Sequence, residues 1–293
     1  MSLARKHRDR ILASQMASAP VTESGLSHTA SAPSSDAGTP AERAAASIAM
    51  RLQHDLRRLK EIQSIQRKIE TKRELLPAYA DWVSGLLQGG RNTGAGVAEE
   101  VLPTIMVWLI DTGDYARALE LADHVVAYDV PLPSRYERSA PALIVEEIAD
   151  AAIRAQTAKQ PFPLDVLEHV EELTADADMH DQVRAKLQKA IGTELARTAE
   201  DLDPAKQSAF DAAVRALVPL RKAILLNERV GVAGQIKRLE KILRKQSEPA
   251  VIDANAAAAR EAYFAEETRV GTDQFPNLAA LALATDTAGS TGS

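Results

Sequence analysis

Apolar residues recur every three or four positions over most of this 293-residue chain, and this spacing constrains its fold more than any other feature. On an α-helix, residues with this spacing line one face, whereas a half-buried strand requires strict alternation. No segment shows convincing alternation bounded by turn signals. The sequence therefore predicts an all-α fold of antiparallel helix pairs with short connections.

Proline, glycine and capping residues divide the predicted helices from one another. A long helix is expected to begin at Pro40 and to run to about Leu76. Further helices are predicted at 77–88, 140–158, 164–173 and 232–246. Four more are predicted from apolar residues that recur over 97–109, 118–126, 183–195 and 210–217. N-caps are expected at Asp114, Ser139 and Asp178, helix ends at Gly89-Gly90 and Gly113, and a kink at Pro219.

One segment suggests how the helix pairs pack. The stretch TGDYARALELADHVVAYD, within 112–129, resembles the turn and second helix of a tetratricopeptide repeat, which normally spans about 34 residues. The Trp-Leu-Gly-Tyr start of that repeat is missing. The match therefore predicts tetratricopeptide-like packing of helix pairs, without membership of that family.

Composition changes along the chain predict four regions. Residues 1–40 are rich in Ala, Ser, Thr and Pro with a basic start, and we expect a disordered arm with room for a short helix at 2–17. Residues 41–76 form a basic amphipathic helix, and 77–246 form the body of helix pairs. Residues 247–293 are expected to be an acidic, Ala-rich flexible tail.

Composition also excludes several classes of protein and site. The chain contains no Cys, which excludes a disulfide framework, a Cys-ligated zinc site, an iron–sulfur cluster and a cysteine nucleophile. The absence of Cys suits a reducing cytoplasm. No apolar run approaches the roughly 18 residues of a membrane span. The basic first ten residues are followed by too short an apolar run for a signal peptide, although an organelle transit peptide is an alternative.

Charge is distributed unevenly along the chain. Residues 1–73 hold 13 Lys and Arg against 7 Asp and Glu, whereas the remainder is acidic. The basic groups concentrate in 51–73, which is either a solvated helix face or a contact with the phosphates of duplex DNA. The predicted DNA-binding residues are Arg51, Arg57, Arg58, Lys60, Arg67, Lys68, Lys72 and Arg73. For a second basic stretch, 221–245, we favour the exposed side of the last helices over a second phosphate contact.

The apolar stripe of the long basic helix has two interpretations. Its positions fit three heptads that are interrupted by polar residues: Ile48, Leu52, Asp55, Leu59, Ile62, Gln66 and Ile69. The stripe either packs on the body of the same chain or forms the seam of a homo-oligomer, with Asp55 and Gln66 setting the register.

No motif in the sequence identifies an active site. The Gly-rich stretch GGRNTGAG at 89–96 lacks the Gly-Lys-Ser/Thr ending of a phosphate loop, and we expect a mobile connector there. No His pair or Ser-His-Asp arrangement is visible, and His124 is expected to be structural. Carboxylates that could hold a metal occur at Asp111 with Asp114, at Glu146 with Glu147 and Asp150, and at Asp176 with Asp178. Helix capping and exposed acidic faces explain them as well, so catalytic residues stay unidentified and no cofactor is indicated by a motif.

Four blocks of sequence resemble a known family. They are TKRELLPAYADWVSGLL (71–87), LPTIMVWLIDTGDYARALELADHVVAYDVPLP (102–133), APALIVEEIADAAIRA (140–155) and LTADADMHDQVRAKLQKAIG (173–192). These blocks are similar to the gpM-type small, or endonuclease, subunit of the packaging terminase of temperate tailed phages. The similarity spans about 45–245.

The resemblance implies a function and a set of partners. A terminase recognises concatemeric phage DNA, cuts it to define a genome end and docks that end on a procapsid for ATP-driven packaging. The expected partners are double-stranded phage DNA, the large ATPase subunit and further copies of the chain, and no membrane is expected to take part. The protein is expected to act in the cytoplasm of the bacterial host, or to be encoded there by a prophage. Mg²⁺ is expected only if the chain itself cuts DNA. The rival interpretation is a helical-repeat adaptor that binds an acidic protein and has no role with nucleic acid.

Overall fold

A computed structural model describes residues 3–18, 38–97 and 99–247 of the chain. In these ranges the regular structure consists of eleven α-helices and two 3₁₀ turns, with no strand, which confirms the all-α prediction. The helices are α1 (Leu3–Ala17), α2 (Pro40–Glu61), α3 (Ile65–Leu75), α4 (Ala80–Thr93), α5 (Val101–Thr112), α6 (Tyr115–Ala127), α7 (Ala140–Thr157), α8 (Leu164–Leu173), α9 (Asp181–Glu200), α10 (Gln207–Leu226) and α11 (Ala233–Ser247). The 3₁₀ turns are η1 (Leu76–Ala78) and η2 (Glu228–Val230).

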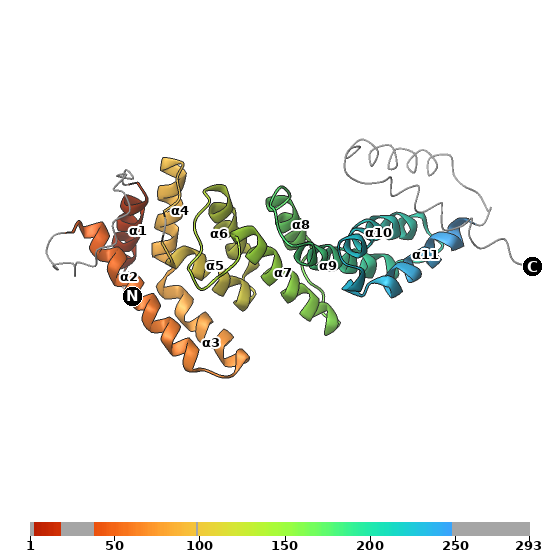
Figure 1. Cartoon of the computed structure of the whole chain (residues 1–293), viewed down its shortest axis with the longest axis horizontal. Helices are drawn as coiled ribbons and strands as arrows, with labels where there is room; N and C mark the ends of the chain where they lie inside the picture. The colour runs from red at the N-terminus through yellow and green to blue at the C-terminus, as the bar shows by residue number, and fades with distance from the viewer. Residues whose placement is uncertain (1–2, 19–37, 98, 248–293) are drawn as a thin grey trace, which may run out of the picture.

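The described helices follow one another along the long axis of an elongated molecule, from α1–α4 at one end to α9–α11 at the other (Figure 1). The helices α2 and α3 form a hairpin that projects sideways from the first end. Tetratricopeptide-like packing stays a prediction. Among the described helices, none combines the length and the apolar character that crossing a bilayer requires.

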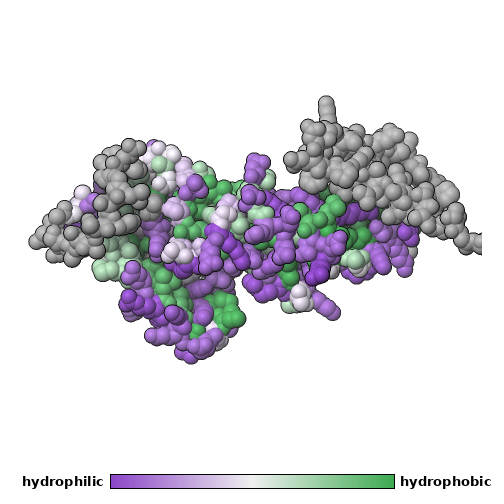
Figure 2. All heavy atoms as spheres, viewed as in Figure 1, coloured by the Kyte–Doolittle hydropathy of each residue, from purple (hydrophilic) through white to green (hydrophobic). Residues whose placement is uncertain are grey.

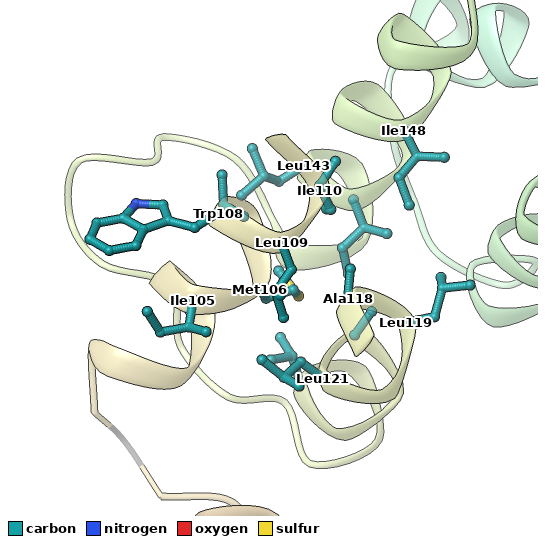
Figure 3. Packing of buried hydrophobic residues seen from close by; sticks show 14 of the residues in the cluster. Ile105, Met106, Trp108, Leu109, Ile110, Ala118, Leu119, Leu121, Leu143 and Ile148 are labelled. Carbon is teal, nitrogen blue, oxygen red and sulfur yellow. The ribbon is translucent and has the colours of Figure 1, made fainter. Parts of the chain in front are cut away.

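The main core forms around α5. Every residue from Val101 to Ile110 is buried, which is the pattern of a helix enclosed on all sides. Figure 3 shows Met106 and Leu109 beside Leu121 of α6, with Leu143 and Ile148 of α7 nearby. Because exposing so apolar a helix to water would be unfavourable, burial of α5 holds the surrounding helices in place.

A second apolar cluster forms between α9, α10 and α11, and it consists largely of alanines with a few larger residues. The helix α9 belongs to both clusters. Its first half contributes Val183 and Leu187 to the main core, and its second half contributes Ala196 and Ala199 to the smaller one. The two ends of the molecule are therefore joined through one continuous helix.

The first helix was not expected to belong to the folded body. The short helix allowed at 2–17 is present as α1 (residues 3–17), but it is not part of a disordered arm: it packs on α4 with Ala13 and Ala17 buried. The approach is close because α4 presents glycines: a Cβ at Gly85 would overlap the backbone oxygen of Arg10, and one at Gly89 would lie 2.8 Å from that of Ser14. The rest of the predicted arm, 19–37, lies outside the described residues.

Two predictions about the end of α4 are wrong. Gly89-Gly90 do not end the helix, since α4 continues to Thr93 and ends at Gly94, whose φ of 68° is left-handed. The predicted connector at 89–96 is therefore helical over its first half. A side chain at Gly90 would overlap His124 of α6, so this glycine serves helix packing.

The single helix predicted from Pro40 to Leu76 is wrong, because the chain breaks between Glu61 and Ile65. The break is stabilised by Ser64, whose side chain accepts a hydrogen bond from the backbone N–H of Arg67 at 3.3 Å. The predicted start is correct, since α2 begins at Pro40. There Thr39 and Glu42 form a capping box, with hydrogen bonds of 3.2 and 2.6 Å.

The remaining caps confirm some predictions and correct one. Asp114 caps α6 through the N–H of Arg117, and Gly113 ends α5 with a φ of 80°. Ser139 precedes α7, but its side chain makes no capping hydrogen bond. The start of α9 is at Asp181, after His180, so Asp178 is not its cap. Most of the predicted acidic tail, residues 248–293, lies outside the described residues.

Candidate nucleic-acid interface

The hairpin of α2 and α3 is fixed to the body by a buried polar pair as well as by apolar residues. Leu52 and Leu59 of α2 are buried, and between them Asp55 accepts a hydrogen bond of 2.6 Å from the hydroxyl of Tyr79. Burial, and then the neighbouring Asp55, raises the pKa of Tyr79 well above its ordinary value. The central stripe positions of the predicted oligomer seam therefore pack on the same chain.

Three of the eight predicted DNA-binding residues hold the hairpin in place. Arg51 donates to the carbonyl of Ala78 at 3.4 Å, and Arg73 donates to the carbonyl of Thr112 at 3.1 Å. Lys72 forms an ion pair with Asp111 at the end of α5. These side chains tie α2 and α3 to η1 and α5, although Arg73 stays exposed to solvent.

The other predicted residues are available to solvent. Arg57, Lys60 and Arg67 are exposed, Lys68 is half-buried, and none of these four side chains has a hydrogen-bond or ion-pair partner among the described residues. Arg58 is exposed and lies 3.7 Å from Glu74. On the face shown in Figure 2, the projecting hairpin carries mainly hydrophilic side chains around hydrophobic patches.

The end of the hairpin concentrates positive charge further. Arg67 and Lys68 lie in the first turn of α3, where unpaired backbone N–H groups give the helix a positive end. Lys60 lies in the last turn of α2, on the other side of the break. Basic groups therefore flank the break at 62–64 on both sides.

Sequence reasoning missed a basic cleft between α1 and α2. Its lining includes Arg5 and Arg8 of α1 and Arg43 and Arg51 of α2, with Asp9 and Asp81 as counter-charges. Arg5 and Arg8 each lie 3.9 Å from Asp9. The signal was present in the basic first ten residues. It was not placed, because the short helix allowed at 2–17 was not expected to pack on the folded body.

The second basic stretch, 221–245, is partly engaged in packing. Arg221 of α10 pairs with Glu240 of α11 at 3.2 Å, and Lys222 pairs with Glu171 at 2.9 Å. Arg238 pairs with Glu200 at 2.8 Å. These ion pairs join the last helices to one another and to α8 and α9.

The candidate metal carboxylates are mostly paired with basic residues. Asp111 pairs with Lys72, and Arg117 lowers the pKa of Asp114 by hydrogen bonding to it. Glu146 pairs with Arg138 and Lys186, and Asp150 pairs with Lys186 at 3.0 Å. Burial raises the pKa of Glu147. Asp176 and Asp178 lie in the connection between α8 and α9.

These carboxylates do not fit a divalent metal ion such as Mg²⁺. Within the described ranges, no group of three or more His, Cys, Asp or Glu side chains is arranged to hold a metal. A lysine or arginine already occupies the oxygens of most candidates.

His124 lies at the junction of α4 and α6. It is buried, its ring packs edge-on against Tyr128 at 4.6 Å between centroids, and it contacts the surface left open by Gly90. Burial, and then the nearby Arg91, lowers its pKa. A buried imidazole kept neutral in this way serves packing, as the sequence predicted.

Comparison with known proteins gives two relatives and one family. The profile of the phage small terminase subunit family matches residues 49–182. The chain is 40% identical over 200 residues to a terminase endonuclease subunit of Escherichia phage P2, a match that covers 68% of this chain and 74% of that protein. It is 24% identical over 191 residues to a probable terminase endonuclease subunit of Haemophilus phage HP1, covering 64% and 66%. No solved structure gives a significant match. The chain therefore belongs to the phage small terminase subunit family.

Proposed function

We propose that the chain binds phage DNA at the genome-end site through the α2–α3 hairpin and recruits the large ATPase subunit for cutting and packaging. The observation that carries the DNA contact is the exposure of Arg57, Lys60 and Arg67 without partners among the described residues. Such side chains can exchange their counterions for phosphates, and this exchange drives binding to duplex DNA.

The way the hairpin is held supports the same function. Asp55, Lys72 and Arg73 fix its base to the body, so its exposed cations are presented on a rigid support. A rigid support lowers the entropy that is lost when the side chains meet a phosphate backbone. A helical-repeat adaptor for an acidic protein would share the charge, so the choice of ligand has to be tested directly.

The test neutralises the hairpin without shortening its side chains. The variant Arg57→Gln/Lys60→Gln/Arg67→Gln is compared with Arg154→Gln/Lys159→Gln/Arg215→Gln, which removes the same number of exposed positive charges, also without ion-pair partners among the described residues, from α7, the residues after it and α10. Fluorescence anisotropy measures Kd for a labelled duplex between about 50 and 200 mM salt. Each lost phosphate contact lowers the slope of log Kd against log salt by about 0.9.

We expect the hairpin variant to lower the salt slope by about 2.7 and to bind all duplex sequences more weakly, and the control to keep the wild-type slope. Equal slopes for the hairpin variant and the wild type would remove the hairpin from the DNA interface. Binding of an acidic protein without measurable duplex binding would favour the adaptor.

We place the contact with the large subunit in residues 248–293. This segment carries 7 acidic residues and 2 arginines, with Tyr263 and Phe264 as apolar contacts, and such a composition suits a protein partner better than DNA. A chain ending at Ser247 keeps α11 and should still bind duplex DNA, but it should no longer co-purify with the large subunit. Full recovery of the large subunit by the shortened chain would place the contact on the helical body.

The relatives are named endonuclease subunits, so the location of the cutting activity also has to be tested. The purified chain is incubated with cognate end-sequence DNA and Mg²⁺, with and without the large subunit. We expect cutting only in the presence of the large subunit. Cutting by the chain alone would show that it carries the nuclease itself.

A further inference from the structure

The last three helices form a part of the molecule that the family profile does not reach. The profile ends at residue 182, and α9, α10 and α11 follow with an apolar cluster of their own. Residues 181–247 hold 14 Lys and Arg against 8 Asp and Glu, a net charge of +6. This end of the molecule is therefore basic, like the end that carries the hairpin.

The middle of the molecule has the opposite charge. Residues 74–180 hold 6 Lys and Arg against 19 Asp and Glu, a net charge of −13. These residues include α7 and α8, which lie between the hairpin and α9–α11 along the long axis (Figure 1). A duplex lying against the whole length would be repelled by the middle, so its phosphates are attracted to the two ends.

The positive charge at this end gathers on one side of α11. Leu239 and Ile242 of α11 are buried against the neighbouring helices. The opposite side carries Lys237, Lys241 and Arg244, whose spacing of four and three residues puts them on one face. We call these three residues the α11 basic face.

The α11 basic face is not needed to hold the helices together. Its side chains are exposed and have no hydrogen-bond or ion-pair partner in the part of the chain that the structure describes. The neighbouring Arg221 and Arg238 make the ion pairs that fix α11 to α10 and α9. Charge left exposed beside completed ion pairs is available to a ligand.

The chemistry of the face favours a phosphate backbone over a folded protein. Protein interfaces usually need aromatic or large apolar side chains at their centre, and no large apolar residue of α11 is exposed among those described. From Lys237 to Arg244 the helix rises by about 10 Å, which is about three phosphate steps along one DNA strand.

We propose that the α11 basic face is a second contact with the backbone of duplex DNA, separate from the hairpin at the other end. The proposal rests on the proposed function for the class of its ligand, but it concerns different residues. The acidic middle then keeps the duplex away from the body between two points of contact. Two linked contacts bind more tightly than either does alone, because the second forms within one complex.

The experiment uses the full chain and a labelled 60-base-pair duplex of mixed sequence. Anisotropy measures Kd against salt for Lys237→Gln/Lys241→Gln/Arg244→Gln, for the hairpin triple variant, for the two combined, and for the Arg154, Lys159 and Arg215 control. Loss of three phosphate contacts should lower the salt slope by about 2.7, so the ratio of the Kd of the variant to that of the wild type should fall about 40-fold between about 50 and 200 mM salt. The combined variant should lose about twice that slope.

A charge-preserving variant, Lys237→Arg/Lys241→Arg/Arg244→Lys, should bind the duplex like the wild type. Its failure to do so would assign the effect to helix packing and overturn the proposal. An unchanged slope for the α11 Gln variant would also overturn it, and if the hairpin variant still lost slope, the proposed function would stand. Unchanged duplex binding together with lost binding to the large subunit would reassign the face to a protein partner.

Discussion

Two alanines in α4 provide a direct test of the packing of α1. A helical Gly→Ala change normally stabilises by up to about 1 kcal/mol, because alanine restricts the unfolded chain and favours the helix. At Gly85 and Gly89, however, each new Cβ would overlap atoms of α1, including the carbonyl of Arg10 and the Cβ of Ala17. These are backbone atoms or the short side chain of an alanine, so α1 itself must shift.

Overpacking of this kind costs about 1–3 kcal/mol at each site. After subtraction of the helix gain, we expect Gly85→Ala/Gly89→Ala to lower the free energy of unfolding by about 2 kcal/mol. The matched control is Gly234→Ala in α11, where the nearest neighbouring atom, Nη1 of Arg238, would lie 3.8 Å from the new Cβ. This control should raise the free energy of unfolding by up to about 1 kcal/mol.

Urea denaturation followed by circular dichroism measures both changes, and hydrogen exchange reports on α1. The double variant should show faster exchange over residues 3–17, since its cost is relieved by moving α1 away from α4. A double variant as stable as Gly234→Ala, with α1 still protected, would refute the close packing of α1 on α4.

Two further predictions concern buried polar groups near the hairpin and at the start of α5. Tyr79→Phe removes the donor to the buried carboxylate of Asp55 and should lower the free energy of unfolding by about 1–3 kcal/mol, whereas Tyr128→Phe should have little effect; urea midpoints compare the two variants. Burial raises the pKa of Glu99, whose carboxylate accepts from the N–H groups of Val101 and Leu102, from 4.5 to about 7. The folded state therefore favours the protonated carboxyl group of Glu99. The stabilisation that this protonation gives is complete below about pH 4.5 and is lost as the pH rises through about 7, which lowers the free energy of unfolding by at most about 3 kcal/mol. Glu99→Gln should flatten the dependence of the urea midpoint between pH 5 and 8, and an unchanged dependence would contradict this assignment.

Local sequence signals located the helices of the body well. The period of apolar residues predicted 140–158 and 164–173 closely, since α7 and α8 occupy 140–157 and 164–173. Asp114 and Gly113 worked as signals because each acts on its own neighbours within a few residues. Such local chemistry is readable without knowledge of the fold.

Two errors had different causes. The period of three or four continues through Ile62 and Ile65, and no Pro or Gly marks the break, so its local signal, the N-cap Ser64, was missed. Gly89 was interpreted as a helix end, although its role is to admit α1. That role depends on a segment about seventy residues earlier in the chain.

The sequence predicted which basic residues make up the candidate site, but not which of them are paired within the protein and which are exposed. The sequence identifies eight basic residues between 51 and 73, but no pattern separates Lys72, which pairs with Asp111, from Arg67, which is exposed without a partner among the described residues. Whether a lysine is engaged depends on which carboxylate the fold brings to it. The DNA-binding set as a whole stays a prediction.

The continuity of α9 has a consequence for how the chain can be divided. A fragment cut at residue 182, where the family profile ends, would remove Val183, Leu187, Ala190 and Ile191 from the main core and leave that core open to water. A fragment that starts at Asp181 would in turn carry these apolar side chains with nothing to cover them. We therefore expect neither piece to fold on its own and the body to unfold in one transition, so functional dissection by deletion has to spare α9.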